Sequence, residues 1–105
     1  MVNKNLQRKV VNHFGVREQS IIAMEECSEL IQAISKSMRY PNDIGRHNNL
    51  AEEIADVLLC VEQIKSIYNV DDVEVDRWTD FKQTRQLDRM GIKGLYVENG
   101  EYGTY

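Results

Sequence analysis

Two acidic motifs at helical spacing constrain this chain more than any other feature of its sequence. The first motif, EECSE, contains Glu26 and Glu29, and the second, EEIAD, contains Glu53 and Asp56. Residues three or four apart lie on one face of an α-helix, so each motif points two carboxylates in the same direction. If the two helices pack side by side, the four carboxylates meet at one point.

Four bare carboxylates at one point repel one another, and such a cluster either raises some of its pKa values or recruits a cation. A ligand set made only of acidic oxygens suits Mg²⁺ or Mn²⁺ better than zinc. Glu26 and Glu29 also border the stripe of Ile22, Leu30 and Ile34 that helical periodicity predicts to be buried. Acids without a partner would cost stability there. We therefore predict a divalent-metal site between the two helices.

Apolar periodicity and helix-breaking residues predict an all-α, four-helix bundle-like fold. The expected helices cover Asn3 to Phe14, Arg17 to Arg39, Leu50 to about Asn69, and a last stretch to about Met90 that is capped by Asn69 or Asp71, with Glu74 at capping-box spacing from Asp71. The breaker from Tyr40 to Gly45 makes the second and third helices a central antiparallel hairpin. The hairpin then places the acids near the middle of both helices.

The helical pattern stops at Gly91, where glycine and tyrosine become frequent. We expect an all-α domain over residues 1–90 and a short irregular tail over residues 91–105. Within the tail, Gly94 to Val97 is a candidate for a short strand or for docking on a partner subunit, and Asn99-Gly100 is a turn signal.

Size and charge narrow the class of protein. A chain of 105 residues with a net charge of −4 forms one modest domain, and it lacks the basic footprint of a protein that binds duplex nucleic acid. The longest apolar run, Val57 to Val61, is far short of the ~20 residues that span a bilayer, and the N-terminus has no signal-peptide stretch. Cys27 and Cys60 are expected to be reduced core thiols. We expect a cytoplasmic protein with neither nucleic acid nor membrane as a partner.

The order EExxE and then ExxD resembles the all-α nucleoside triphosphate pyrophosphohydrolases, the MazG-like superfamily, over roughly Glu18 to Arg89. The resemblance implies that Glu26, Glu29, Glu53 and Asp56 bind Mg²⁺. It also implies cleavage of a nucleoside triphosphate to the monophosphate and pyrophosphate. Glu25, one residue off the ligand face, would orient a further metal ion or a water. Relatives of this size associate, so a homodimer or homotetramer is expected.

The last helix carries one stripe with an aromatic residue and cations, Trp78, Lys82, Arg85 and Arg89. In the family that this chain resembles, a basic residue on this helix touches substrate phosphates, and Lys82 is the position that matches it, with Arg85 second. Trp78, Phe81 or side chains of the first helix are candidates to face the base. The alternative is an ordinary solvated face with Trp78 packed against its neighbours.

A different class of function stays open at this point. The chain can also be a non-catalytic helical module whose acidic cluster binds metal for stability or engages a protein partner. Metal-dependent release of pyrophosphate separates the enzyme from that module. Within the enzyme class, a house-cleaning role on a non-canonical or pyrimidine deoxynucleotide such as dUTP or dCTP is a variant, because base preference depends on the shape of the pocket.

Overall fold

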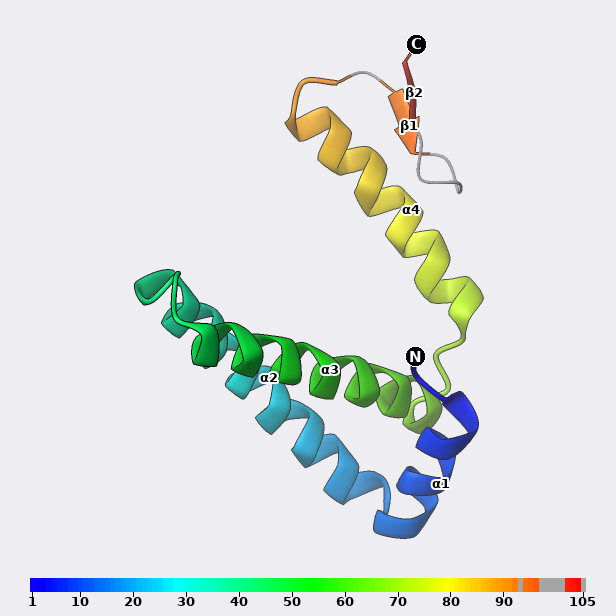
Figure 1. The fold of residues 1–105 in the computed structure, drawn as a ribbon. Coiled ribbons are helices and arrows are strands. Elements are labelled where there is room, and N and C mark those ends of the chain that lie inside the picture. Colours follow the sequence, from blue (N-terminus) through cyan, green and yellow to red (C-terminus); the bar gives the residue numbers. More distant parts are fainter. Residues whose placement is uncertain (93, 97–101, 105) are drawn as a thin grey trace. The chain divides into compact units, whose positions relative to one another are not determined.

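In a computed structural model, the chain divides into two compact units, residues 1–69 and residues 70–105. The structure describes residues 1–92, 94–96 and 102–104, with side chains for residues 1–92. The first unit consists of helices α1 (Lys4–Phe14), α2 (Val16–Arg39) and α3 (Ile44–Ile67), and the second contains helix α4 (Asp72–Arg89) and strands β1 (Gly94–Tyr96) and β2 (Tyr102–Thr104) (Figure 1). The all-α class and its four helices are confirmed.

Local capping and one glycine explain where the first two helices begin and end. The Asn3 side chain accepts a hydrogen bond from the Leu6 backbone N–H at 2.9 Å, which starts α1. Gly15 then separates α1 from α2, with a φ of +100°. This backbone conformation is strained for any residue that has a side chain, so it favours glycine. A sharp change of direction between the two helices follows from this one residue.

Helix α3 begins at Ile44, earlier than the predicted start at Leu50. The cause is Asp43, whose side chain accepts a hydrogen bond from the Arg46 backbone N–H at 3.1 Å and so caps the helix. The polar run that follows Asp43 is therefore the first part of the helix and not a connection to it.

Helices α2 and α3 form the predicted hairpin, and α1 packs against both of them. Each hairpin helix has 24 residues and is thus about 36 Å long. Few apolar side chains in this unit are buried: Val11, Ala23, Ala33 and Cys60. The prediction of a buried Ile22, Leu30 and Ile34 stripe is wrong for the single chain, because Ile34 is 46% exposed and Ile22 is 36% exposed.

A chain of buried amides joins all three helices of the first unit. Gln19 Nε2 on α2 donates to Gln63 Oε1 on α3 at 2.9 Å, and Gln63 Nε2 donates to Gln7 Oε1 on α1 at 2.8 Å. Buried amides require such partners, so this network fixes how far each helix is shifted along its neighbours.

The second unit begins with the predicted cap. The Asp71 side chain accepts a hydrogen bond from the Glu74 backbone N–H at 2.8 Å, and α4 follows. The described residues of the tail form no helix, as predicted, and β1 pairs antiparallel with β2 so that Leu95 lies opposite Gly103. The strand predicted from Gly94 is confirmed, whereas the predicted Asn99-Gly100 turn lies outside the described residues. A domain boundary at residue 90 stays a prediction.

Within the described part of the chain, no helix is both long enough and apolar enough to cross a bilayer.

Candidate metal site

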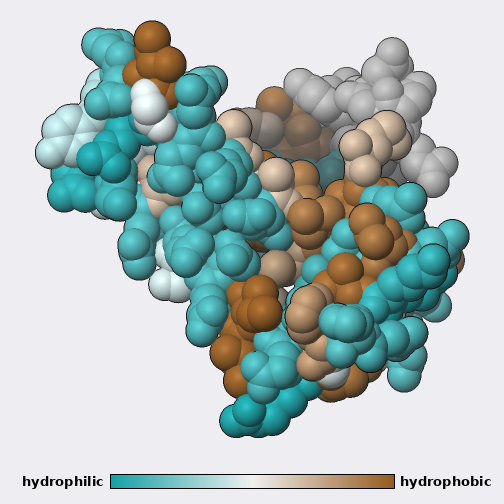
Figure 2. Space-filling view, turned by 60° about the horizontal axis from the view of Figure 1, so that its bottom comes forward, coloured by the Kyte–Doolittle hydropathy of each residue, from teal (hydrophilic) through white to brown (hydrophobic). Residues whose placement is uncertain are grey.

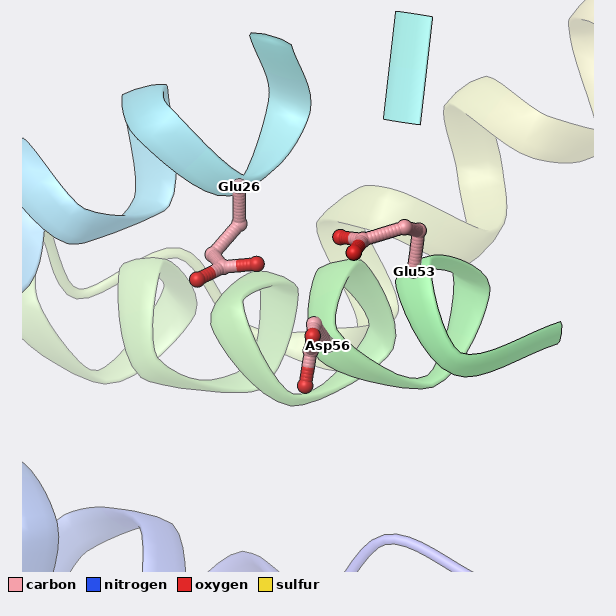
Figure 3. Close-up of side chains that lie close together, drawn as sticks. All are labelled: Glu26, Glu53 and Asp56. Carbon is pink, nitrogen blue, oxygen red and sulfur yellow. The ribbon is translucent and has the colours of Figure 1, made fainter. Parts of the chain in front are cut away.

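Three carboxylates from the two hairpin helices lie together in the first unit. Glu26 on α2 and Glu53 and Asp56 on α3 each offer one carboxylate oxygen, and these three oxygens lie within 4.8 Å of one another. Figure 3 shows Glu26 pointing from α2 toward the helix that carries the other two. The cluster joins residues of both acidic motifs, which are far apart in the sequence.

Small residues on α2 flank the cluster. Ala23 and Ala33 are buried, one on each side of Glu26 along the helix. Because neither side chain extends beyond a methyl group, α2 and α3 can approach closely and the acids can meet across the interface. The acids lie near the middle of both helices, as the sequence predicts.

The remaining acids of the two motifs are placed differently. Glu29 lies close enough for its charge to raise the pKa values of both Glu26 and Glu53, but it is not one of the three groups within 4.8 Å. Glu25 and Glu52 are exposed. The structure thus brings together three of the four predicted ligands, with the fourth beside them, and the ligand roles stay a prediction.

Burial and mutual repulsion raise the pKa values of two carboxyl groups in this cluster. The pKa of Glu26 is raised from 4.5 to about 7, first by burial and then by the charges of Glu29, Asp56 and Glu53. Burial also raises the pKa of Glu53, followed by repulsion from Glu29 and Asp56. The metal-free cluster therefore retains protons that isolated carboxyl groups would release.

Two oxygens of the cluster have no hydrogen-bond partner. Glu26 Oε2 and Glu53 Oε2 are both buried and unpaired, and Glu53 as a whole is only 9% exposed. A buried carboxylate without a donor is unfavourable, and a cation between the helices would satisfy both oxygens at once. With oxygen as the only ligand atom, the residues present fit Mg²⁺ or Mn²⁺.

Sequence reasoning did not place Cys60 at this cluster. Its thiol is buried one helical turn beyond Asp56, and its pKa is raised to about 11 by burial and then by the charges of Glu26, Cys27 and Asp56. The thiol is therefore neutral, and it lies close enough to Glu26 and Asp56 for their charges to affect it. The spacing of four residues from Asp56 is the signal that could have placed it there.

The predicted substrate-binding residues lie on α4, in the second unit. Trp78 packs edge-to-face on Phe81, with ring centroids 5.9 Å apart, and the Arg85 guanidinium lies 6.0 Å from the Phe81 ring centroid. Trp78 is 59% exposed, so it is not simply packed within its own unit, and Lys82 is exposed as well. The structure does not test a role for these residues at the acidic cluster, and that role stays a prediction.

Residues 18–77 match the family model described as the MazG nucleotide pyrophosphohydrolase domain. The match covers more than half of the chain and includes both acidic motifs, whereas Trp78, Lys82 and Arg85 lie just beyond it. None of the curated proteins and none of the solved structures compared with the chain matches it.

Proposed function

The chain belongs to the family of MazG nucleotide pyrophosphohydrolase domains, and from that membership we propose that it hydrolyses a nucleoside triphosphate to the monophosphate and pyrophosphate with Mg²⁺. The observation that carries the proposal is the meeting of Glu26, Glu53 and Asp56 across the hairpin, with two buried oxygens unpaired. Mn²⁺ is an alternative ion with the same ligand preference.

The charge of the substrate explains why the acids need a cation. A triphosphate is strongly negative, and the carboxylates would repel it. Mg²⁺ bound to Glu26, Glu29, Glu53 and Asp56 would supply positive charge that holds the phosphates, lowers the pKa of a water and stabilises the transition state. The residues of the chain hold the ligand oxygens in place, because the amide network fixes the register of α2 against α3.

Other residues are proposed to act around this centre. Glu25 is exposed next to Glu26 and would orient the attacking water or a further metal ion. Lys82 and Arg85 would neutralise phosphate charge that the metal leaves unmatched, and Trp78 would stack on the base. In the proposed reaction, water adds across the anhydride link between the α- and β-phosphates: its oxygen stays on the attacked phosphorus, its protons pass to the products or to solvent, and the monophosphate and pyrophosphate separate.

The proposed biological role is house-cleaning, that is, the hydrolysis of unwanted nucleoside triphosphates in the cytoplasmic nucleotide pool. The substrate is a nucleoside or deoxynucleoside triphosphate, with pyrimidine deoxynucleotides such as dUTP and dCTP as variants to be compared. We retain a homodimer or homotetramer as part of the proposal.

A nucleotide panel tests the proposed reaction. The purified chain is incubated with each common and non-canonical (deoxy)nucleoside triphosphate and Mg²⁺, and both products are measured. Equal amounts of monophosphate and pyrophosphate, abolished by a chelator, are expected for at least one substrate. Metal-dependent stabilisation without turnover of any nucleotide would instead favour the non-catalytic metal-binding module, and release of diphosphate with orthophosphate would place the cleavage at the wrong bond.

A further inference from the structure

The turn that joins α2 to α3 carries positive charge on an otherwise acidic chain. Over residues 36–49, called here the hairpin tip, Lys36, Arg39 and Arg46 stand against a single acid, Asp43. The tip therefore has a net charge of +2, and because the whole chain carries −4, the remainder carries −6. Such a separation of charge draws anions toward the tip.

Two arginines of the hairpin tip lie against one tyrosine ring. The guanidinium carbon of Arg39 is 6.0 Å from the centroid of the Tyr40 ring, and that of Arg46 is 5.5 Å from it. Arg39 belongs to the last turn of α2 and Arg46 to the first turn of α3. An aromatic ring attracts a guanidinium at this distance. The ring therefore gathers positive charges from both helices at one place.

Among residues 1–92, no acidic side chain forms an ion pair with either guanidinium. Asp43 is the nearest acid in the sequence, and its side chain accepts a hydrogen bond from the Arg46 backbone N–H at 3.1 Å, where it caps α3. A guanidinium that stacks on a ring keeps the N–H groups at its edge available, and these groups bind phosphate oxygens in pairs. The hairpin tip thus offers unmatched donors to an anion.

The hairpin tip is also open to solvent. Tyr40 is 51% exposed, and its apolar neighbours in the sequence, Met38 and Ile44, are each 78% exposed. Helix α1 lies against the opposite end of the hairpin (Figure 1). Figure 2 shows the outer end of the hairpin, on the left as in Figure 1, as a mainly hydrophilic surface interrupted by hydrophobic atoms. A ligand can therefore reach the guanidiniums without any movement of the helices of the first unit.

We propose that the hairpin tip binds a chain of linked phosphates, and that it does so without a metal ion. The two guanidinium carbons are separated by no more than the sum of their distances to the Tyr40 centroid, a range over which linked phosphates present oxygens to both. Inorganic tripolyphosphate and the phosphate chain of a nucleoside triphosphate share this chemistry. Because the tyrosine holds both side chains in place beforehand, less entropy is lost on binding.

The charge of the chain favours a small ligand with dense charge over an acidic protein partner. An acidic segment long enough to form an interface would extend beyond the hairpin tip toward surfaces that carry −6 in total, and these would repel it. Linked phosphates instead concentrate several negative charges in a small space. Lys36, one turn before Arg39 on α2, adds a third positive charge to the same end of the hairpin.

The hairpin tip is separate from the acidic cluster. On α3, Arg46 precedes Glu53 by seven residues, or about 10 Å along the helix axis, and its guanidinium contacts the ring of Tyr40 outside the helix. The acids repel phosphate unless a cation intervenes, whereas the tip attracts phosphate through side chains alone. The proposal therefore depends on neither metal binding nor turnover at the acids, and a chain that hydrolyses no nucleotide can still satisfy it.

The test measures the binding of inorganic tripolyphosphate to protein that has been freed of metal on a chelating resin. Calorimetric titration should show saturable binding of one tripolyphosphate per chain, and added salt should weaken it. Arg39→Gln and Arg46→Gln should each lower the affinity at least about tenfold, as expected for the loss of a charge-assisted contact. Tyr40→Leu keeps both charges but releases the two side chains, so the affinity should fall about 3- to 10-fold.

Arg8→Gln is the matched control, because it removes the same charge from an exposed position on α1. It should change the affinity by less than about twofold, since salt screens a distant charge. Circular dichroism should show that every variant is folded. Equal losses in Arg8→Gln and Arg46→Gln would overturn the proposal in favour of diffuse attraction. An unchanged affinity in Tyr40→Leu, or a wild type that does not bind tripolyphosphate, would overturn it as well.

Further titrations of the same metal-free protein separate the sources of the phosphate chain. The nucleotide dCTP should bind as tripolyphosphate does and should lose the same factor in Arg46→Gln, whereas deoxycytidine, which has no phosphate, should not bind. Binding of dCTP without binding of tripolyphosphate contradicts the proposal, because the base is then the feature that is recognised. Tighter binding of polyglutamate than of tripolyphosphate also contradicts it, because the hairpin tip then fits an acidic protein partner.

Discussion

Glu26 on α2 and Asp56 on α3 each offer a carboxylate oxygen within 4.8 Å of the other, and burial followed by the charges of Glu29, Asp56 and Glu53 raises the pKa of Glu26 to about 7. Two ionised carboxylates this close repel each other, so the raised pKa favours a proton on Glu26 in the metal-free protein. The two acidic motifs thus meet at a pair of acids whose repulsion a proton or a cation relieves. This relationship makes the stability of the hairpin depend on pH and on cations.

The first prediction concerns pH. An unfolded chain has an ordinary glutamate pKa near 4.5, so the folded chain holds the Glu26 proton more tightly. The stabilisation from this proton is complete below about pH 4.5 and is lost as the pH rises through about 7, and Glu53 shifts in the same direction. Metal-free protein should therefore lose stability between pH 5 and pH 8 from these groups, as measured by thermal melts.

Mg²⁺ should reverse that loss at pH 8 and have little effect at pH 5, because it competes with the protons for the same oxygens. Melting curves with and without Mg²⁺ at both pH values provide the comparison. Equal stabilisation by Mg²⁺ at pH 5 and pH 8 would show that the ion binds away from Glu26.

The second prediction compares two neighbouring glutamates. Glu53→Gln keeps the size of a buried side chain but removes one charge from the cluster, so pyrophosphate release should fall more than tenfold at saturating Mg²⁺. Without metal, the same variant should melt at a higher temperature than wild type at pH 8, because repulsion from Glu29 and Asp56 is relieved.

Glu52→Gln is the control for this change, since Glu52 is exposed on the same helix. Glu52→Gln should change neither the rate of pyrophosphate release nor the melting temperature by much. Equal losses of activity in the two variants would show that Glu53 has no special role as a ligand.

The third prediction concerns the buried amide network. Gln63→Ala deletes both hydrogen bonds of the central amide and leaves Gln19 Nε2 and Gln7 Oε1 without partners. Each of these two unsatisfied buried groups costs about 1–3 kcal/mol, so the free energy of unfolding should fall by about 2–6 kcal/mol in urea titration. Gln32→Ala, at an exposed position of α2, should change it by less than about 0.5 kcal/mol. A similar small change in Gln63→Ala would mean that water replaces the lost amide.

The fourth prediction concerns Lys82 on α4. If Lys82 binds phosphate, Lys82→Ala should weaken substrate binding or turnover about 10- to 100-fold, the value of one charge-assisted contact. On the same premise, Mg²⁺ binding to the substrate-free protein should be unchanged or slightly tighter, because the substitution would remove positive charge that competes with the metal ion for the carboxylates. Lys82→Arg should restore only part of the activity, since the guanidinium places its charge differently.

Arg77→Ala supplies the control, because it removes a cation from an exposed position on another side of α4. Calorimetric titration of Mg²⁺ and steady-state pyrophosphate release are measured on the same preparations. If Lys82→Ala loses both metal affinity and activity, Lys82 has a structural role. If neither changes, other residues bind the substrate phosphates.

Features that depend only on neighbours along the chain could be predicted from the sequence. Asp71 at capping-box spacing from Glu74 marks the start of α4, and the spacing of Glu53 and Asp56 places both carboxylates on one side of α3. Such features are local because hydrogen bonds and helix geometry within a few residues decide them. The hairpin also followed from local signals, since a strong breaker separates two long periodic segments.

The tertiary structure alone decided which residues of those helices are buried. Helical periodicity favours Ile22, Leu30 and Ile34 as the buried stripe, but the α2–α3 interface buries Ala23 and the amide of Gln19 instead. An amphipathic pattern shows that an apolar face exists, yet it does not show which neighbour covers it, because rotating a helix by one position changes its partner. The raised pKa of Glu26 has the same origin, since burial and the charges of Glu53 and Asp56 reach it only across the packed interface.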